Sequence, residues 1–203
     1  MARRSDHSRK ELTKLALESA RQIVAEEGID GLSGRKVTRK IGYTIGTLYQ
    51  LFEDMDDLVE RMNVQTLEQL YAHCQLDESP DEVAAQLKEL GQRFIEFVSL
   101  HPNEWHAVMG YRYKDNHTTS DAYNGAIQKL FGLMERVTLP LYADDERQEQ
   151  SLDMALLWTS LTGLLGIAAS ERKLAGGSIE EMTERLIKMY LASRPPIASG
   201  TIG

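Results

Sequence analysis

The stretch that most constrains the fold of this chain is residues 33–58, SGRKVTRKIGYTIGTLYQLFEDMDDL. Ser33 is a residue type that caps the start of a helix, and Val37 and Ile41 share one face of that helix at an i, i+4 spacing. Gly42 can adopt the positive φ that ends it. A second short helix follows at once, so the stretch predicts two helices joined by a glycine turn of about 3–4 residues, which is a helix-turn-helix.

The second of these helices has a buried side and a side open to a partner. Thr44 can cap its start, and Leu48 and Phe52 point inward at an i, i+4 spacing. Its outer side chains are small or polar, and the preceding helix carries the basic residues Arg35, Lys36, Arg39 and Lys40. A basic helix beside a short helix with a small, polar outer face indicates a surface that reads DNA.

Charge is divided unevenly along the chain, whose formal net charge is −8. Residues 1–52 contain ten Lys/Arg and six Asp/Glu, a net charge of +4, so the remainder carries −12. A basic N-terminal region fits contact with phosphate, and an acidic remainder limits indiscriminate binding to DNA. The net charge alone would argue against binding to nucleic acid, but the distribution of charge along the chain does not.

Apolar residues recur at helical spacing along most of the 203 residues, and alternating strand patterns are scarce. The chain is therefore predicted to be all-α. We expect a helix-turn-helix DNA-binding domain at 1–53, a ligand-binding and dimerisation domain at 54–193 and a disordered tail at 194–203. Besides the helix-turn-helix, the expected helices are 9–27, one starting after 53, 81–100, 105–113, 121–137, 146–173 and 179–191.

A single cysteine, Cys74, excludes an intramolecular disulfide and fits a reducing compartment. No signal peptide is evident, and the longest apolar run, 154–169, is shorter than the roughly 20 residues that span a bilayer. We expect a cytoplasmic protein with no membrane association.

Enzyme and metal motifs are not found. No nucleophile lies at a workable spacing from a base, no glycine loop could cradle phosphate, and no zinc pattern occurs. His101, His106 and His117 with Asp115 have no compact ligand spacing, so surface or capping roles are favoured over a metal site. The chain is expected not to be an enzyme and to need no cofactor.

Together with the preceding helix, the opening stretch resembles the tetracycline-repressor-like (TetR) family of bacterial transcriptional regulators, from about Leu12 to Leu58. The resemblance implies an all-helical homodimer of about nine helices, with a DNA-binding head and a body that binds a small-molecule inducer. The matching residues are Ala20, Ile23, Gly28, Leu32, Ser33, Val37, Ile41, Gly42, Tyr43, Thr44, Gly46, Leu48, Tyr49, Phe52 and Leu58.

The stretch departs from the family pattern at three places. Ile41 replaces an alanine before the turn glycine, Leu51 replaces a His or Tyr, and Met55 replaces a lysine that meets phosphate in the family. In the body, Trp158 and Gly163 are similar to the subgroup named for a Trp-His-Gly motif, although Thr162 occupies the His position.

The DNA-binding hypothesis assigns two roles to the head. Hydroxyls, an amine and the start of a helix would hold phosphates, while Arg35 and the outer face of the second helix would read base edges and thymine methyls. Gly46 would allow a close approach to the groove. The predicted phosphate contacts are Ser33, Lys36, Thr44, Tyr49 and Gln50, and the predicted base-reading residues are Arg35, Ile45 and Thr47. A plain solvated charged face is the alternative.

A dimer is expected because one head covers few base pairs. Its interface is predicted on small residues of the helix 146–173 and on the last helix, with a contact inside one chain as the alternative. These residues are Thr159, Thr162, Gly163, Gly166, Ser170, Met182, Leu186 and Met189.

A ligand pocket is expected between the helices of the body, although each of its residues could instead be plain core. Its aromatic and methionine side chains suit a hydrophobic or aromatic effector, and Arg112 could pair with a carboxylate on it. The other predicted lining residues are Phe94, Phe97, Trp105, Met109, Tyr113, Phe131, Met134 and Trp158.

The sequence thus predicts a one-component regulator, most simply a repressor, that binds a palindromic operator as a dimer and is released by a small effector. The alternative is a helical ligand-binding or protein-interaction module that does not act through DNA.

Overall fold

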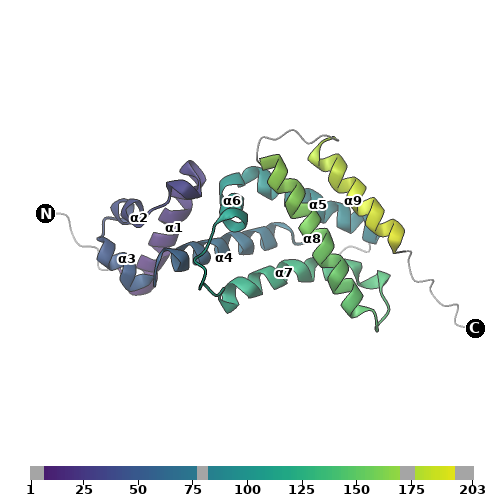
Figure 1. Cartoon of the computed structure of the whole chain (residues 1–203), viewed down its shortest axis with the longest axis horizontal. Helices are drawn as coiled ribbons and strands as arrows, with labels where there is room; N and C mark the ends of the chain where they lie inside the picture. The colour runs from purple at the N-terminus through teal and green to yellow at the C-terminus, as the bar shows by residue number, and fades with distance from the viewer. Residues whose placement is uncertain (1–6, 77–81, 170–176, 195–203) are drawn as a thin grey trace, which may run out of the picture. The chain divides into compact units, whose positions relative to one another are not determined.

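The computed structural model describes residues 7–76, 82–169 and 177–194. Nine α-helices, two short 3-10 helices and no strand occur within these ranges (Figure 1), which confirms the all-α prediction. No helix of the described part is long and apolar enough to cross a membrane. The chain divides into two compact units, 1–68 with 101–124 and 69–100 with 125–203.

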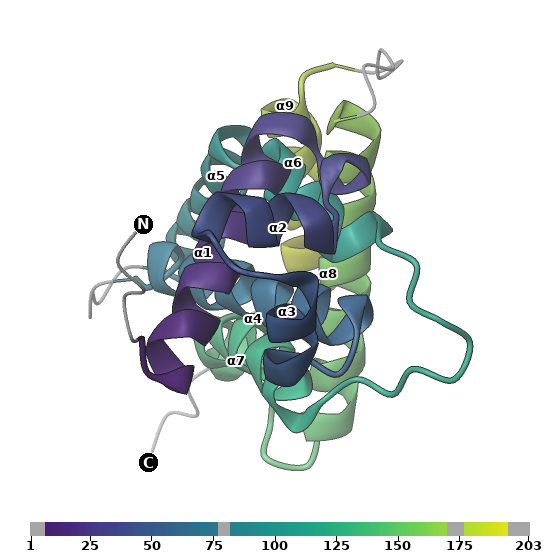
Figure 2. The same ribbon diagram turned by 90° about the vertical axis from the view of Figure 1, so that its left-hand side faces the viewer.

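The first unit contains the helix-turn-helix. Its elements are α1 (Arg9–Glu27), the 3-10 helix η1 (Ile29–Gly31), α2 (Gly34–Ile41), α3 (Ile45–Leu51) and α6 (Pro102–Gly110), together with most of α4 (Met55–His73). In the turned view of Figure 2, α2 and α3 lie in front of α1, and both contact it. The expected domain boundary at residue 53 therefore falls inside this unit.

Local capping signals determine where the head's helices begin and end. Ser33 accepts a hydrogen bond from the Lys36 N–H at 3.4 Å, and Thr44 accepts one from the Thr47 N–H at 3.3 Å. Gly42 ends α2 in the left-handed conformation with φ of 77°. These caps confirm the turn predicted from the sequence.

One apolar core holds the first unit together. Leu12, Ile23, Val37, Leu48 and Phe52 are buried, which agrees with the inward faces expected for Val37, Leu48 and Phe52. Ile41, which was expected to share the inward face of α2 with Val37, is only partly buried, as are Leu15 and Leu32, and the core is completed by residues of α1, α4 and α6. The added core residues include Ala16, Leu17, Ala20, Val24, Leu58, Val59, Met62 and Ala107.

The second unit is built mainly from α5 (Val83–Leu100), α8 (Arg147–Ala169) and α9 (Ile179–Ser193), with most of α7 (Asp121–Thr138) and the 3-10 helix η2 (Leu139–Leu141). α9 packs against both α5 and α8. On α8, Met154, Leu157, Leu161 and Leu165 form the buried stripe, while Leu152 and Leu156 are exposed. This helix therefore has one inner and one outer apolar face.

Helix ends differ slightly from those expected. The helix expected at 105–113 is α6 and runs from Pro102 to Gly110, because proline suits the first helical turn. α8 ends at Ala169 in the described part, and 170–173 lie outside the described residues, as do all but Arg194 of the tail expected at 194–203.

Candidate functional site

α3 presents one exposed face and one buried face. Leu48 and Leu51 are 1% and 7% exposed and anchor the helix in the head core. Ile45 and Tyr49, with exposed fractions of 41% and 51%, project to the other side. Gly46 and Gln50 are also exposed on this helix. This face therefore offers one aliphatic and one aromatic side chain that a partner could contact.

The basic residues of α2 are not equivalent. Arg35, Arg39 and Lys40 are exposed. Lys36 instead forms an ion pair with Glu27 at the end of α1, with 2.5 Å between Nζ and Oε2. The predicted phosphate contact by Lys36 therefore requires the ammonium to leave Glu27 or to share it.

Gly34 is a residue that sequence reasoning did not single out. A Cβ built on it would lie 2.8 Å from Ile45 Cδ1 and 3.0 Å from Leu48 Cδ2. Its backbone thus allows the start of α2 to approach α3 closely. The only signal in the sequence is a glycine directly after the Ser33 cap, where many residue types would be acceptable in a helix.

α1 also supports the far end of α3. The Arg9 guanidinium donates a hydrogen bond from Nη2 to the carbonyl oxygen of Gln50 at 3.0 Å. The last carbonyls of a helix have no partner within the helix, so this contact satisfies one of them. The Gln50 side chain is not involved in it.

Met55 belongs to the head's packing. It is partly buried against the core cluster, and its sulfur would lie 3.5 Å from a Cβ on Gly34. Met55 thus makes an apolar contact inside the unit, at the position where the sequence resemblance implies a phosphate-binding lysine.

The acidic start of α4 is tied to the segment 111–120. Asp56, 4% exposed, accepts hydrogen bonds from the Tyr111 hydroxyl at 2.7 Å and the Lys114 N–H at 3.1 Å. Asp54 accepts from the Lys114 ammonium at 2.5 Å and caps α4 through the Asp57 N–H at 3.0 Å. These carboxylates therefore act within the protein.

Glu60 continues this arrangement one turn later. Its carboxylate accepts from the Ser120 N–H at 3.0 Å and lies 2.5 Å from His117 Nε2. Burial alone would raise the pKa of Glu60, but the hydrogen bonds from Ser120 and His117 outweigh it and lower that pKa. The His117 ring stacks on Tyr113, with 4.4 Å between the ring centroids.

The predicted ligand residues are divided between the two units. Phe94, Phe97, Phe131, Met134 and Trp158 belong to the second unit, whereas Trp105, Met109, Arg112 and Tyr113 belong to the first. In the first unit Trp105 is 2% exposed and Met109 is 51% exposed. The Tyr113 hydroxyl accepts a hydrogen bond from the Asn63 amide at 3.1 Å, which is a structural role.

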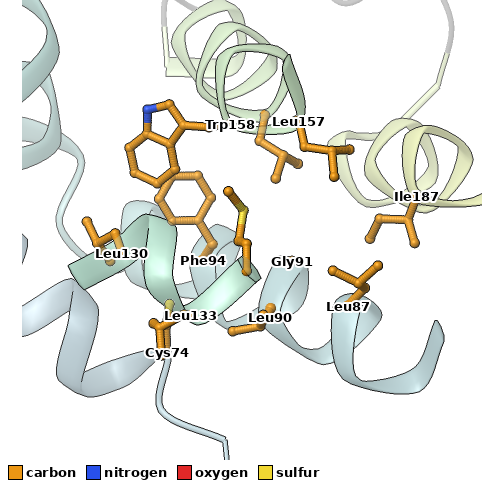
Figure 3. A pocket seen from close by; sticks show the side chains of 12 residues that line it. Cys74, Leu87, Leu90, Gly91, Phe94, Leu130, Leu133, Leu157, Trp158 and Ile187 are labelled. Atoms are coloured by element: carbon orange, nitrogen blue, oxygen red, sulfur yellow. The ribbon is translucent and has the colours of Figure 1, made fainter. Parts of the chain in front are cut away.

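Within the second unit, three of the predicted residues, Phe94, Met134 and Trp158, line an apolar cavity (Figure 3). Trp158 lies between two rings, with centroids 5.4 Å from those of both Phe94 and Phe131. Phe97 packs on His73 instead, at 5.8 Å. The other lining residues are Cys74, Leu87, Leu90, Gly91, Leu130, Leu133, Leu157, Leu161 and Ile187.

An exposed groove between α8 and α9 contains most of the residues predicted for the dimer. Thr159, Gly163, Met182, Leu186 and Met189 line it, with Ser160, Leu164, Glu181 and Arg185. Thr162 is buried and donates its hydroxyl to the Trp158 carbonyl at 2.9 Å, so it is not on this face. Gly166 is exposed beyond the groove lining, and Ser170 lies outside the described residues.

Among the described residues no group of three or more His, Cys, Asp or Glu side chains could hold a metal. His117 binds Glu60, and His101 Nδ1 lies 3.4 Å from Glu104 Oε1. The structure thus does not bring together His101, His106 and His117.

Comparison with known proteins agrees with the geometry of the head. Residues 16–62 match the family model of the bacterial regulatory proteins of the tetR family. The head is a TetR-family DNA-binding domain. The match covers α2, α3 and the start of α4, which carry the face described above. A search of curated proteins finds no significant match to the chain.

Solved structures extend the TetR-like fold over nearly the whole chain. A protein of unknown function from Rhodococcus sp. RHA1 has a TM-score of 0.72 at 16% identity, covering 95% of this chain and 99% of that chain. A TetR transcriptional regulator from the same organism has a TM-score of 0.69 at 15% identity, covering 91% and 98%. A TetR-family regulator from Streptomyces coelicolor has a TM-score of 0.67 at 15% identity, covering 90% and 80%.

At these identities the similarity shows the fold and not the ligand. The second unit of this chain therefore has the fold of the body of a TetR-family regulator, while its cavity and groove must be interpreted from their own residues. The family match is to a class of regulators, in line with the expectation that the chain is not an enzyme.

Proposed function

We propose that this protein is a one-component transcriptional repressor of the cytoplasm that binds a palindromic operator as a homodimer. The observation that carries the proposal is the outer face of α3, where Ile45, Gly46, Tyr49 and Gln50 are exposed beside basic α2. The opposite side of α3 is anchored through Leu48 in the head core. A rigidly backed, exposed short helix next to a basic one is suited to the major groove.

Contacts to DNA divide into positioning and reading. Ser33, Thr44, Tyr49 and Gln50 would hold phosphates, with the Lys36 ammonium joining them when it leaves Glu27. Arg35 would fork onto guanine, and Ile45 and the Thr47 methyl would contact thymine methyls. Arg9 supports this arrangement because it holds the end of α3 through the Gln50 carbonyl.

Two copies are needed to read two half-sites about one helical turn apart. The α8–α9 groove supports such a pairing because Thr159, Ser160 and Gly163 have small side chains that allow close helix approach. Met189 within the groove is 60% exposed, and Leu152 and Leu156 of α8 expose further apolar surface, at 61% and 59%.

Release of DNA would follow from binding of a small, apolar effector in the second unit. An effector changes the population of DNA-binding and non-binding arrangements only if it binds one of them more tightly. The cavity supports this role, because apart from Cys74 its walls are inward-facing residues of the packed helices α5, α7, α8 and α9.

A genomic-fragment selection with the purified full chain tests the proposal. We expect recovery of a few fragments that share an inverted repeat, with binding that weakens steeply as salt rises. Genes beside those fragments would also narrow the effector. Recovery of no fragment over random DNA at moderate salt would contradict the proposal and favour a helical ligand-binding or protein-interaction module.

A further inference from the structure

The cavity of the second unit has apolar walls. Its lining side chains are aliphatic or aromatic, apart from the sulfurs of Cys74 and Met134 and the indole nitrogen of Trp158. No charged group, hydroxyl or amide side chain lines it. We infer that this cavity binds an uncharged, hydrocarbon-like molecule, so that the effector in the proposed function carries no carboxylate, phosphate or ammonium group. The binding itself does not depend on that function.

Burial explains why a charged ligand is excluded. Every lining residue except Trp158 is buried, so a ligand in the cavity loses its water. An ionised group moved there would need a partner, because an unpaired buried charge is very costly. Arg93, the arginine of α5, already donates to Glu89 at 2.5 Å, and Arg112 lies in the first unit.

Cys74 does not provide an ionised partner for a charged ligand. Burial raises the pKa of its thiol to about 12, so the group stays neutral at physiological pH. It therefore behaves as a small apolar wall residue, in keeping with buried free cysteines in general.

The cavity is small. The space open to the centres of water-sized molecules is about 50 Å³, whereas a cavity that holds benzene measures about 150 Å³. A ring-sized ligand must therefore move side chains or helices. Gly91 marks a place where α5 and α9 pack closely, because a Cβ on it would lie 3.1 Å from Thr183 Cγ2 and 3.4 Å from Ile187 Cδ1.

These two atoms are the ends of side chains on α9, the helix that faces α5 at Gly91. In Figure 3, Ile187 and Leu87 lie at one end of the cavity, and Phe94 and Trp158 lie at the other. A ligand that fills the space would thus press on Ile187 of α9 and on the Trp158 indole of α8. Both helices carry the exposed groove on their other sides.

The position of Trp158 makes its fluorescence a reporter of ligand binding. Trp158 is the half-buried member of the lining, which places the rim of the cavity at its indole. Because its ring also contacts Phe94 and Phe131, a ligand beside it should change its fluorescence. Trp105 is in the first unit, so Trp105→Phe leaves Trp158 as the reporter.

The test compares toluene with benzoate, two probes of similar size that differ in charge. With the full chain, we expect toluene to raise the melting temperature saturably and, in the Trp105→Phe variant, to change Trp158 emission at the same concentrations. Benzoate should do neither. Equal or tighter binding of benzoate, or no binding of toluene, would overturn the inference.

A matched pair of substitutions locates the site. Gly91→Leu adds a bulky side chain at the cavity wall between α5 and α9, whereas Gly132→Leu adds the same side chain on α7, where a Cβ has no neighbour within 4 Å. We expect Gly91→Leu to reduce toluene affinity at least ten-fold and Gly132→Leu to leave it unchanged. If Gly91→Leu does not fold, Gly91→Ala serves in its place, with a weaker loss expected; unchanged affinity in the folded Gly91 variant would overturn the assignment.

DNA binding is measured separately. Toluene that binds but leaves operator affinity unchanged would support the cavity assignment and contradict the effector part of the proposed function. Failure to bind any operator, with toluene binding intact, would contradict the regulator and leave the ligand class supported.

Discussion

The Lys36 ammonium lies 2.5 Å from the Glu27 carboxylate, so one basic residue of the proposed DNA-binding face is neutralised within the protein. Gly31 contributes to this contact, because a Cβ there would lie 2.5 Å from Glu27 Cβ and 3.1 Å from its Oε2. Both charged side chains are partly exposed, at 42% and 47%, so the pair adds little to stability. Its effect should instead appear in DNA affinity.

Glu27→Gln should therefore strengthen operator binding several-fold at low salt. The freed Lys36 adds one phosphate contact, which steepens the slope of log affinity against log salt by about 0.9. Fluorescence anisotropy over a salt series measures both quantities. Glu26→Gln is the matched control, since it removes the same charge from an exposed neighbour that is not paired with Lys36. An equal gain in both variants would show a general charge effect and no specific role for the pair.

Two glycine substitutions should separate folding from DNA recognition. Gly34→Ala places a methyl group 3.0 Å from the buried Leu48 side chain and should destabilise the head by about 1–3 kcal/mol. Gly46→Ala lies on the exposed face of α3, where the nearest atom is Thr44 Oγ1 at 3.8 Å.

Gly46→Ala should stabilise the fold by up to about 1 kcal/mol through helix propensity. The added methyl group should still weaken operator binding about ten-fold, or about 1.4 kcal/mol. Urea unfolding and operator titration provide the two readouts. Unimpaired DNA binding by Gly46→Ala would argue that α3 does not approach the groove through this residue.

Acid should weaken the first unit through the carboxylates of α4. The hydrogen bond from Lys114 and then that from the Asp57 N–H lower the pKa of Asp54 below its ordinary 3.8, and the pKa of Glu60 lies below its ordinary 4.5. Each group binds fewer protons when folded. Its contribution to stability is therefore fully present above the ordinary pKa and is lost as pH falls through the lower folded-state pKa.

Glu60→Gln should reduce this acid dependence and cost about 1–3 kcal/mol at neutral pH, because Ser120 and His117 lose a charged acceptor. Urea unfolding between about pH 3 and pH 7 measures the effect. Glu68→Gln, an exposed residue of α4 outside this cluster, should follow the wild-type pH profile. A wild-type profile in Glu60→Gln would exclude Glu60 as the source of the acid dependence.

The outer face of α8 should control self-association. Leu156 of α8 is 59% exposed, so Leu156→Glu should leave the monomer's stability within about 0.5 kcal/mol. In the proposed dimer the new carboxylate would be buried in the interface, so it should separate the two copies and abolish operator binding. Sedimentation equilibrium measures the oligomeric state of the variant. The control is Leu100→Glu, which makes the same change at a 65% exposed leucine of α5. A dimer that persists in Leu156→Glu would place the interface elsewhere.

Local features of the head were predictable because they depend on neighbouring residues. The Ser33 and Thr44 caps and the Gly42 turn each follow from backbone geometry within a few positions. The close approach at Gly34 was not predictable, since it depends on where Ile45 and Leu48 lie in space.

The predicted ligand residues show more clearly what could not be predicted from the sequence. Helical spacing shows that Trp105 and Phe94 are inward-facing, but both satisfy the same pattern in different compact units. Periodicity does not reveal which helix a face will meet. Leu87, Gly91 and Ile187 line the cavity although ordinary aliphatic residues and glycine carry no binding signal in a sequence. Thr162 likewise fits the small-residue stripe by spacing, while its side chain is buried.

The most direct test of DNA recognition is the affinity of charge-reversed variants for the selected operator and for random DNA. Arg35→Glu with Lys36→Glu changes the DNA-facing helix, whereas Lys129→Glu with Arg136→Glu makes the same charge change on exposed residues of α7. A specific binder prefers its operator by on the order of 10³-fold or more. We expect this preference to fall to near one in the Arg35 and Lys36 variant and to persist in the α7 control; an unchanged preference in the former would show that DNA recognition does not depend on these residues.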